Sequence, residues 1–224
     1  TVHYANQMQL TGAKEAVIEY TEKNADFHQI VADMANIPRK QAKTINLGLS
    51  YGMGKEKLIK ELGVDDLEAE NLFKQYHAKV PFIRALQDQC ARVAMDRGYI
   101  RTFAGRRCRF DRWESRYEKT TPLPLQEARN KYGSSLKRSY TYKALNRLIQ
   151  GSAADMTKLA MIDLWEEGIV PHLQVHDEVD ISIENTEQAN TVTRIMENCV
   201  KLAVPLLVDI ELGTSWGETK DIKQ

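Results

Sequence analysis

The stretch RKQAKTINLGLSYGMG, residues 39–54, constrains the fold of this chain more than any other feature. Four side chains in it share a spacing of four residues: Arg39, Lys43, Leu47 and Tyr51. Because a four-residue step advances about 40° around an α-helix, the four form one slowly turning stripe. The stripe is cationic at its start and apolar to aromatic at its end. Such a surface can hold a polyphosphate at one end and a flat base at the other. An amphipathic helix with two solvated cations is the plain alternative.

A second informative segment, HLQVHDEVDISI, covers residues 172–183. Its apolar residues recur at every second position on each side of residues 176–178: Leu173, Val175, Val179, Ile181 and Ile183. This pattern predicts two strands separated by a polar tip at His176. Neighbouring residues on a strand point to opposite faces, so only one of Asp177 and Glu178 is expected to meet a given metal ion directly.

The first stretch resembles motif B of the family A DNA polymerases, whose pattern is R-x-x-x-K-x-x-x-[F/Y]-G-x-x-Y-G. Leu47 departs from it, because the family usually has an aromatic residue there. The resemblance implies a helix of the fingers domain, over residues 39–52, that closes over the incoming nucleotide. It places Arg39 and Lys43 on the triphosphate, Leu47 beside the incoming sugar and Tyr51 near the templating base.

Other segments resemble the same family in chain order. His176-Asp177-Glu178 is similar to motif C, which implies that Asp177 is a catalytic metal ligand, Glu178 an accessory catalytic acid and His176 a contact to the primer end. The family's D-x-H is similar to residues 26–28 and implies a phosphate contact by His28. Two further segments imply DNA contacts. A segment similar to the family's T-x-x-G-R-R hairpin implies contacts by Arg106 and Arg107, and one similar to a palm helix implies contacts by Asn146 and Gln150. Tyr142 stands where the family often has an arginine.

The resemblance implies template-directed nucleotidyl transfer from dNTPs to a primer 3′-end on primer-template DNA, with Asp177, Glu178 and Lys43 as catalytic residues. Two Mg²⁺ ions are the expected cofactors, and carboxylates from two motifs must hold them. The family's motif A, D-Y-S-x-x-E-x-R, does not occur in the sequence. We therefore expect an upstream polymerase fragment, carrying motif A and the thumb, as a partner, and an inactive isolated chain. Gene splitting, intein processing and an artificial or proteolytic truncation are the competing explanations of that expectation.

Two other functions compete with polymerisation. A non-catalytic nucleic-acid-binding module with a polymerase-like fold would not need Arg39, Lys43 and Asp177 together. A metal phosphohydrolase would use the His176-Asp177 pair, but such pairs usually lie on helices, whereas the flanking residues here favour strands.

Charge is unevenly distributed in a chain whose net charge is zero. Residues 129–147 contain six Lys or Arg and no acid, whereas residues 177–224 contain ten acids and four bases. A basic track beside an acidic, metal-holding half suits contact with phosphate backbone near a cation site. The odd cysteine count favours a reducing compartment, and no apolar run is long enough to cross a membrane. We expect no membrane partner and a cytoplasmic location, at the site of DNA replication.

The expected fold class is α+β, with a mostly helical fingers subdomain at residues 1–98 and a palm part with an antiparallel sheet at residues 99–224. Asp65 is expected to cap one helix and Gly98 to end another. The predicted helices cover residues 13–21, 26–35, 39–51, 55–62, 65–79, 81–97, 126–132, 143–167 and 186–201. A hairpin is predicted at residues 99–110, turning at Ala104-Gly105, a loop at 113–124 and a last strand at 206–212.

Overall fold

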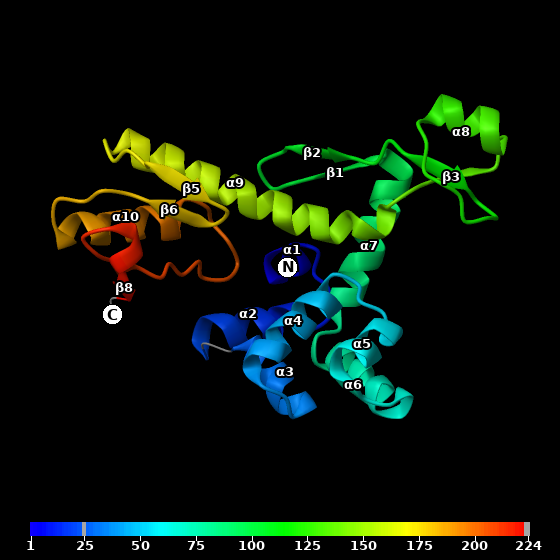
Figure 1. The fold of residues 1–224 in the computed structure, drawn as a ribbon, viewed down its shortest axis with the longest axis horizontal. Helices are drawn as coiled ribbons and strands as arrows, with labels where there is room; N and C mark the ends of the chain where they lie inside the picture. Colours follow the sequence, from blue (N-terminus) through cyan, green and yellow to red (C-terminus); the bar gives the residue numbers. More distant parts are fainter. Residues whose placement is uncertain (24–25, 222–224) are drawn as a thin grey trace. The chain divides into compact units, whose positions relative to one another are not determined.

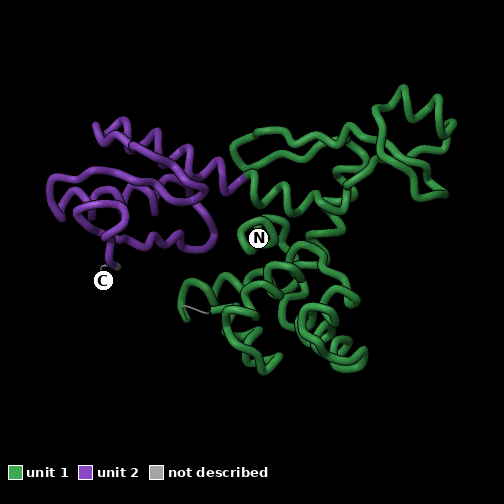
Figure 2. The backbone as a smooth tube through the Cα atoms, in the orientation of Figure 1, with its two compact units in different colours: residues 1–151 green, residues 152–224 purple. Residues whose placement is uncertain are grey.

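The computed structural model describes residues 1–23 and 26–221 and has the expected α+β architecture. Contacts between residues divide the chain into two compact units, residues 1–151 and 152–224 (Figure 2). The division falls inside a long helix, α9 (Ala144–Glu166), whose first two turns belong to the first unit. The separation into fingers and palm at residue 98 is a functional assignment, and it stays a prediction.

The first unit is mostly helical (Figure 1). Its helices before α9 are α1 (Val2–Gln7), α2 (Ala13–Glu22), α3 (Phe27–Ala35), α4 (Arg39–Ser50), α5 (Lys55–Leu62), α6 (Asp66–Lys79), α7 (Phe82–Arg97), α8 (Leu125–Tyr132) and the 3₁₀ turn η1 (Thr141–Lys143). Asp65 caps α6, its Oδ1 accepting from Glu68 N at 2.8 Å. Gly98 ends α7 in the left-handed conformation, at φ 76°. Both predicted boundaries are confirmed, whereas the short α1 was not predicted.

The hairpin predicted at residues 99–110 is confirmed. Strand β1 (Tyr99–Arg101) pairs antiparallel with β2 (Arg107–Arg109), and Ile100 lies opposite Cys108. Gly105 in the connecting turn adopts φ 85°, a conformation that disfavours side chains. The turn therefore forms where the sequence placed it.

The loop predicted at residues 113–124 is wrong in its first part. Strand β3 (Trp113–Ser115) pairs antiparallel with β4 (Leu136–Arg138). The Arg138 guanidinium lies 4.4 Å from the centre of the Trp113 ring and donates to the Phe110 carbonyl at 3.0 Å. The pairing joins segments more than twenty residues apart, so the local pattern, with its prolines after Ser115, did not reveal it.

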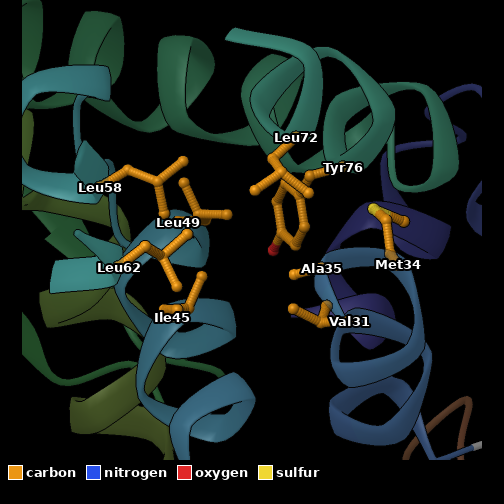
Figure 3. Close-up of a pocket in the computed structure, with 9 residues that line it drawn as sticks. All are labelled: Val31, Met34, Ala35, Ile45, Leu49, Leu58, Leu62, Leu72 and Tyr76. Carbon is orange, nitrogen blue, oxygen red and sulfur yellow. The ribbon is translucent and has the colours of Figure 1, made fainter. Parts of the chain in front are cut away.

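Two apolar clusters hold the first unit together. One joins α7, β1, the segment after β2 and the start of α9, and its buried residues are Leu86, Cys90, Ala94, Ile100, Phe110, Ala144, Leu145 and Leu148. The other lies between α3, α4, α5 and α6 (Figure 3). The void left in it measures only about 10 Å³ and is lined by Val31, Met34, Ala35, Ile45, Leu49, Leu58, Leu62, Leu72 and Tyr76. A void of that size holds one water molecule at most, so the four helices pack as one block.

The second unit combines the rest of α9 with a small hairpin and one further long helix. Its elements are β5 (Leu173–Val175), β6 (Glu178–Asp180), α10 (Thr186–Asn198), β7 (Glu211–Leu212), the 3₁₀ turn η2 (Trp216–Glu218) and β8 (Lys220–Asp221). Strands β5 and β6 pair antiparallel, with Val175 opposite Glu178. Leu164, Ile169 and Ile195 form the buried core of this unit.

Two predicted boundaries in the second unit are wrong. Helix α10 ends at Asn198 instead of residue 201, and its last buried residue is Ile195. The strand predicted at 206–212 shrinks to Glu211–Leu212, although half-buried and exposed residues do alternate there. The Val208 N–H donates to the Glu197 carboxylate at 3.2 Å instead of joining a strand ladder.

Candidate active site

The predicted stripe lies on the exposed side of α4. The opposite side of the helix is buried through Ala42, Ile45 and Leu49. Arg39 and Lys43 are exposed, and Leu47 keeps 42% of its surface accessible. The core contacts of α4 are made by Ala42, Ile45 and Leu49. The stripe that begins with Arg39 and Lys43 is therefore available to a ligand.

Arg39 is held by Asp26 at the start of α3. Arg39 Nε and Nη2 each lie 2.7 Å from Asp26 Oδ2. The other oxygen, Oδ1, caps α3 by accepting from the N–H groups of His28 at 2.9 Å and Gln29 at 3.1 Å. Burial works to raise the pKa of Asp26, but the hydrogen bonds from Arg39 and from these two N–H groups outweigh it and lower the pKa. Asp26 therefore stays ionised and fixes the Arg39 guanidinium next to α3.

His28 lies close to the cations Arg39 and Lys43. Partial burial lowers the pKa of the His28 imidazole; the charge of Asp26 opposes the shift, and the charges of Arg39 and Lys43 reinforce it. Its Nδ1 lies 3.0 Å from Asn46 Nδ2 on α4. The structure thus brings together the three residues predicted to meet a triphosphate, on two helices that pack against each other.

The C-terminal end of α4 is also fixed by side chains. Tyr51 closes the helix, and its hydroxyl accepts from Gln150 Nε2 at 3.1 Å. Gln87 on α7, which the sequence analysis missed, donates to the carbonyls of Leu49 at 3.1 Å and Ser50 at 2.9 Å. The bond to Ser50 satisfies a carbonyl group of the kind that a helix end leaves without a backbone partner, whereas the Leu49 carbonyl also accepts from Gly52 N at 3.1 Å. Two predicted site residues, Tyr51 and Gln150, therefore lie in contact.

The two arginines of the β1–β2 hairpin have different surroundings. Arg106 Nη2 donates to the Gly151 carbonyl at 2.6 Å, and a Cβ atom at Gly151 would lie 2.9 Å from Thr102 Cγ2. A side chain at position 151 would force Thr102 to shift, so this close approach favours glycine. Arg107 is exposed and stacks 4.8 Å from the centre of the Tyr99 ring. Asn146 is half-buried in the first turn of α9.

His176, Asp177 and Glu178 lie at the tip of the β5–β6 hairpin, and all three are exposed. His176 and Asp177 form a two-residue turn, and Glu178 begins β6. The two predicted strands on either side of the polar tip are confirmed, but the expectation that Asp177 lies on a strand beside Glu178 is wrong. His176 has φ 57°, a conformation that costs free energy for residues other than glycine, and the Gln174 side chain donates to its carbonyl.

The carboxylates of Asp177 and Glu178 suit a hard cation such as Mg²⁺, which prefers oxygen ligands. Across residues 1–23 and 26–221, no group of three or more His, Cys, Asp or Glu side chains is placed to hold a metal ion. The described residues therefore hold no complete ligand set at this hairpin. None of the helices in these described residues is both long and apolar enough to span a bilayer.

A hydrogen-bonded chain behind α4 was missed by the sequence analysis. The Tyr76 hydroxyl, on α6, donates to Asn46 Oδ1 at 3.0 Å and lies 2.9 Å from Ser50 Oγ. Asn46 and Ser50 are one turn apart on α4, and this spacing was the available signal of a shared polar face. The tyrosine lies 30 positions after Asn46, so the sequence gives no sign that it completes the chain.

The chain is similar to DNA polymerases of phages and bacteria. The family model for DNA polymerase family A matches residues 9–218. A DNA-directed DNA polymerase of Pseudomonas phage M6 is 36% identical over 232 residues, covering 88% of this chain and 32% of that protein. The thermostable DNA polymerase I of Thermus aquaticus is 34% identical over 224 residues, covering 92% of this chain and 25% of that enzyme. The DNA polymerase of Mycobacterium phage L5 is 33% identical over 206 residues, covering 90% of this chain and 30% of that protein.

A solved structure has a similar fold. It is the polymerase domain of Pol1 from M. smegmatis, in complex with DNA primer-template and dNTP, and it matches with a TM-score of 0.64 at 27% identity. The match covers 85% of this chain and 34% of that one. The chain spans between a fifth and a third of the length of the relatives it matches.

Proposed function

Because the chain belongs to DNA polymerase family A, we propose that it forms the fingers, residues 1–98, and the C-terminal palm part, residues 99–224, of a template-directed DNA polymerase. The observation that carries the proposal is the gathering of His28, Arg39 and Lys43 along α3 and α4. Three basic side chains on one rigid pair of helices suit a triphosphate better than they suit scattered contacts to solvent.

In the proposed reaction, the stripe on α4 binds the incoming dNTP. Lys43 and the Arg39 guanidinium neutralise charge on the phosphates, and His28 donates a hydrogen bond to them. Lys43 also donates a proton to the departing pyrophosphate. Leu47, exposed in the middle of the stripe, packs beside the sugar, and Tyr51 lies next to the templating base. Pre-positioned charges of this kind stabilise a transition state without reorganisation.

Asp177 is the proposed metal ligand, and Glu178 is proposed as an accessory acidic residue beside it. Family A polymerases generally use Mg²⁺, which when bound in a pair of ions polarises the reacting phosphate and activates the primer 3′-hydroxyl. Because a two-metal site needs carboxylates from more than one segment, we propose that polymerase sequence N-terminal to this chain supplies the second catalytic aspartate.

The proposed nucleic-acid partner is a primer-template duplex, and the proposed location is the cytoplasm, where replication takes place. Arg106, Arg107, Asn146 and Gln150 would contact the duplex, and His176 would contact the primer end. The fold of this chain resembles a polymerase domain that was solved with DNA primer-template and dNTP, which supports this assignment. The contact between Gln150 and Tyr51 links a predicted DNA contact to the predicted template-base contact.

Primer extension tests the proposal. The chain is assayed with Mg²⁺, four dNTPs and primer-template, first alone and then with the N-terminal polymerase segment that carries the second catalytic aspartate. Extension that needs both parts and is lost in Asp177→Asn is the expected result. Binding of primer-template without extension in either mixture would favour a non-catalytic nucleic-acid-binding module.

A further inference from the structure

A chain of four side chains connects the buried interior of the α3–α6 block to His28. It runs from Ser50 Oγ to the Tyr76 hydroxyl at 2.9 Å, then to Asn46 Oδ1 at 3.0 Å. From Asn46 Nδ2 it continues to His28 Nδ1 at 3.0 Å. The links join α3, α4 and α6, so the chain is a tertiary feature and not a local helix contact.

The direction of the hydrogen bonds follows from the donors available. A tyrosine hydroxyl has one proton, and Tyr76 gives it to Asn46 Oδ1. The bond between Ser50 and Tyr76 must then be donated by Ser50. Since the Asn46 oxygen is turned to Tyr76, its amide nitrogen is turned to His28 and donates to Nδ1.

Tyr76 is suited to set this direction because it is nearly fully buried, at 3% exposure. Figure 3 shows its ring projecting from α6 into the space between α3 and α4, with the hydroxyl at its far end. Burial raises the pKa of Tyr76 to about 12, although the hydrogen bond from Ser50 opposes the shift. The phenol therefore keeps its proton at every pH where a polymerase would be assayed.

We infer that Tyr76 and Asn46 are positioning residues that hold the His28 imidazole in its Nε2–H tautomer, so that Nε2 donates a hydrogen bond to a phosphate oxygen of the incoming nucleotide. A neutral imidazole has one N–H, and Nδ1 is occupied as an acceptor. No hydrogen bond from Nε2 to any residue in the described part of the chain is found. The functional half of this inference rests on the proposed function.

The charges around His28 agree with a neutral donor. Asp26 caps the N-terminus of α3, the helix that carries His28, whereas Arg39 and Lys43 come from α4. Two cations nearby already neutralise phosphate charge, and Asp26 is engaged by Arg39. A locked Nε2–H adds to these two cations a neutral donor of fixed direction.

Nitrogen NMR tests the tautomer without DNA or nucleotide. The chain is labelled with ¹⁵N-histidine, and the His28 signals are assigned by their loss in His28→Asn. At a pH where the ring is neutral, we expect Nδ1 to show the shift of an unprotonated nitrogen. Tyr76→Phe should move this signal toward a mixture of tautomers, and Asn46→Asp should protonate Nδ1 outright, because a carboxylate only accepts. Ser50→Ala, which leaves the Tyr76–Asn46 bond in place, is the matched control and should change the signal least.

A protonated Nδ1 in the wild-type chain would overturn the inference, because the hydrogen bonds would then run in the opposite direction. An unchanged Nδ1 signal in Tyr76→Phe would overturn the role of Tyr76. A purely structural role for the network would lower the stability of all three variants without altering the tautomer signal.

The functional half is tested in the assembled polymerase. Tyr76→Phe is expected to raise KM for dNTP by about three- to tenfold, the range of one hydrogen bond, while kcat and primer-template affinity change by less than about twofold. An unchanged KM would overturn the phosphate contact. Absence of extension by the wild-type assembly would count against the proposed function alone, because the tautomer measurement decides the positioning role by itself.

Discussion

The α3–α4 pair and the β5–β6 hairpin carry the two halves of the proposed chemistry in different ways. On α3 and α4, predicted ligand residues are tied down by other side chains: Asp26 holds Arg39, and Asn46 holds His28. On the hairpin, His176, Asp177 and Glu178 are exposed at a turn whose first residue is left-handed. The predicted binding residues are thus held by side chains of their own unit, whereas the carboxylates are presented on a short two-stranded ribbon that is marginal by itself.

The difference between the two regions suits the two proposed roles, phosphate binding and metal binding. A phosphate site benefits from side chains locked by packing and hydrogen bonds before the ligand arrives. A metal site shared between segments benefits from an accessible carboxylate, because its other ligands come from elsewhere. We therefore expect changes on the hairpin to alter catalysis with little loss of stability, and changes in the α3–α4 network to alter both.

Asp177→Asn should have the largest effect. Losing a metal-binding carboxylate removes several kcal/mol of transition-state stabilisation, so primer extension by the assembled polymerase should fall by a factor on the order of 10³ or more. The stability of the chain should change by less than about 0.5 kcal/mol, because the side chain is exposed. Glu184→Gln, an exposed acid just after the hairpin, is the matched control. Extension within tenfold of wild type would contradict the assignment of Asp177.

Lys43→Ala tests the other region. Loss of one charged hydrogen bond to phosphate should lower kcat/KM for dNTP by about 10- to 100-fold. Lys40→Ala is the control, because Lys40 is an exposed lysine on the same helix but off the stripe. Equal losses of kcat/KM in the two variants would show that only the general positive charge of α4 matters, and would contradict a specific role of the stripe.

His176→Gly should separate strain from chemistry on the hairpin. Glycine adopts the left-handed conformation at φ 57° without strain. We therefore expect urea unfolding to show a free energy of unfolding that is higher by up to about 1 kcal/mol. The proposed contact of His176 with the primer end would be lost, so primer extension should fall. His172→Gly, at an exposed position without positive φ, should instead destabilise the chain by about 0.5–1 kcal/mol. Destabilisation by both substitutions would show that the turn stores no strain.

The smallest effect concerns pH. Burial lowers the pKa of His28 in the folded chain below its ordinary value of 6.5, so the unfolded chain binds the proton more readily. The stabilisation from a neutral His28 is complete above about pH 6.5 and is lost as the pH falls through the folded-state pKa. The melting temperature of the wild type should therefore fall more steeply below pH 6.5 than that of His28→Gln. Parallel curves of melting temperature against pH for the two proteins would contradict the lowered pKa of His28.

Local signals predicted much of the fold. Helix α6 begins at its aspartate cap, Asp65, and α7 ends at Gly98, because capping depends on residues within one turn. The stripe on α4 was predicted for a similar reason, since helical periodicity places its members before any tertiary contact forms. Predictions based on spacing within a helix therefore needed no knowledge of the rest of the fold.

Long-range contacts are what the sequence could not reveal. The partner of β3 lies beyond α8, and the Tyr76 hydroxyl reaches Asn46 from another helix. The placement of Asp177 in the turn was missed because alternation predicts strands but not where a two-residue connection falls. The residues of the site were thus predicted from motifs, whereas the side chains that position them became visible only in the structure.

Metal rescue of Asp177→Cys tests the central assignment most directly. A thiolate binds Mg²⁺ poorly and softer ions such as Zn²⁺ well. In the assembled polymerase, we predict that Asp177→Cys loses primer extension with Mg²⁺ alone and regains a measurable part of it when Zn²⁺ is added, whereas Asp177→Ala stays inactive under both conditions. Rescue confined to the cysteine variant would identify Asp177 as a metal ligand in nucleotidyl transfer. Full activity of Asp177→Cys with Mg²⁺ alone, or equal behaviour of the cysteine and alanine variants with both metals, would contradict it.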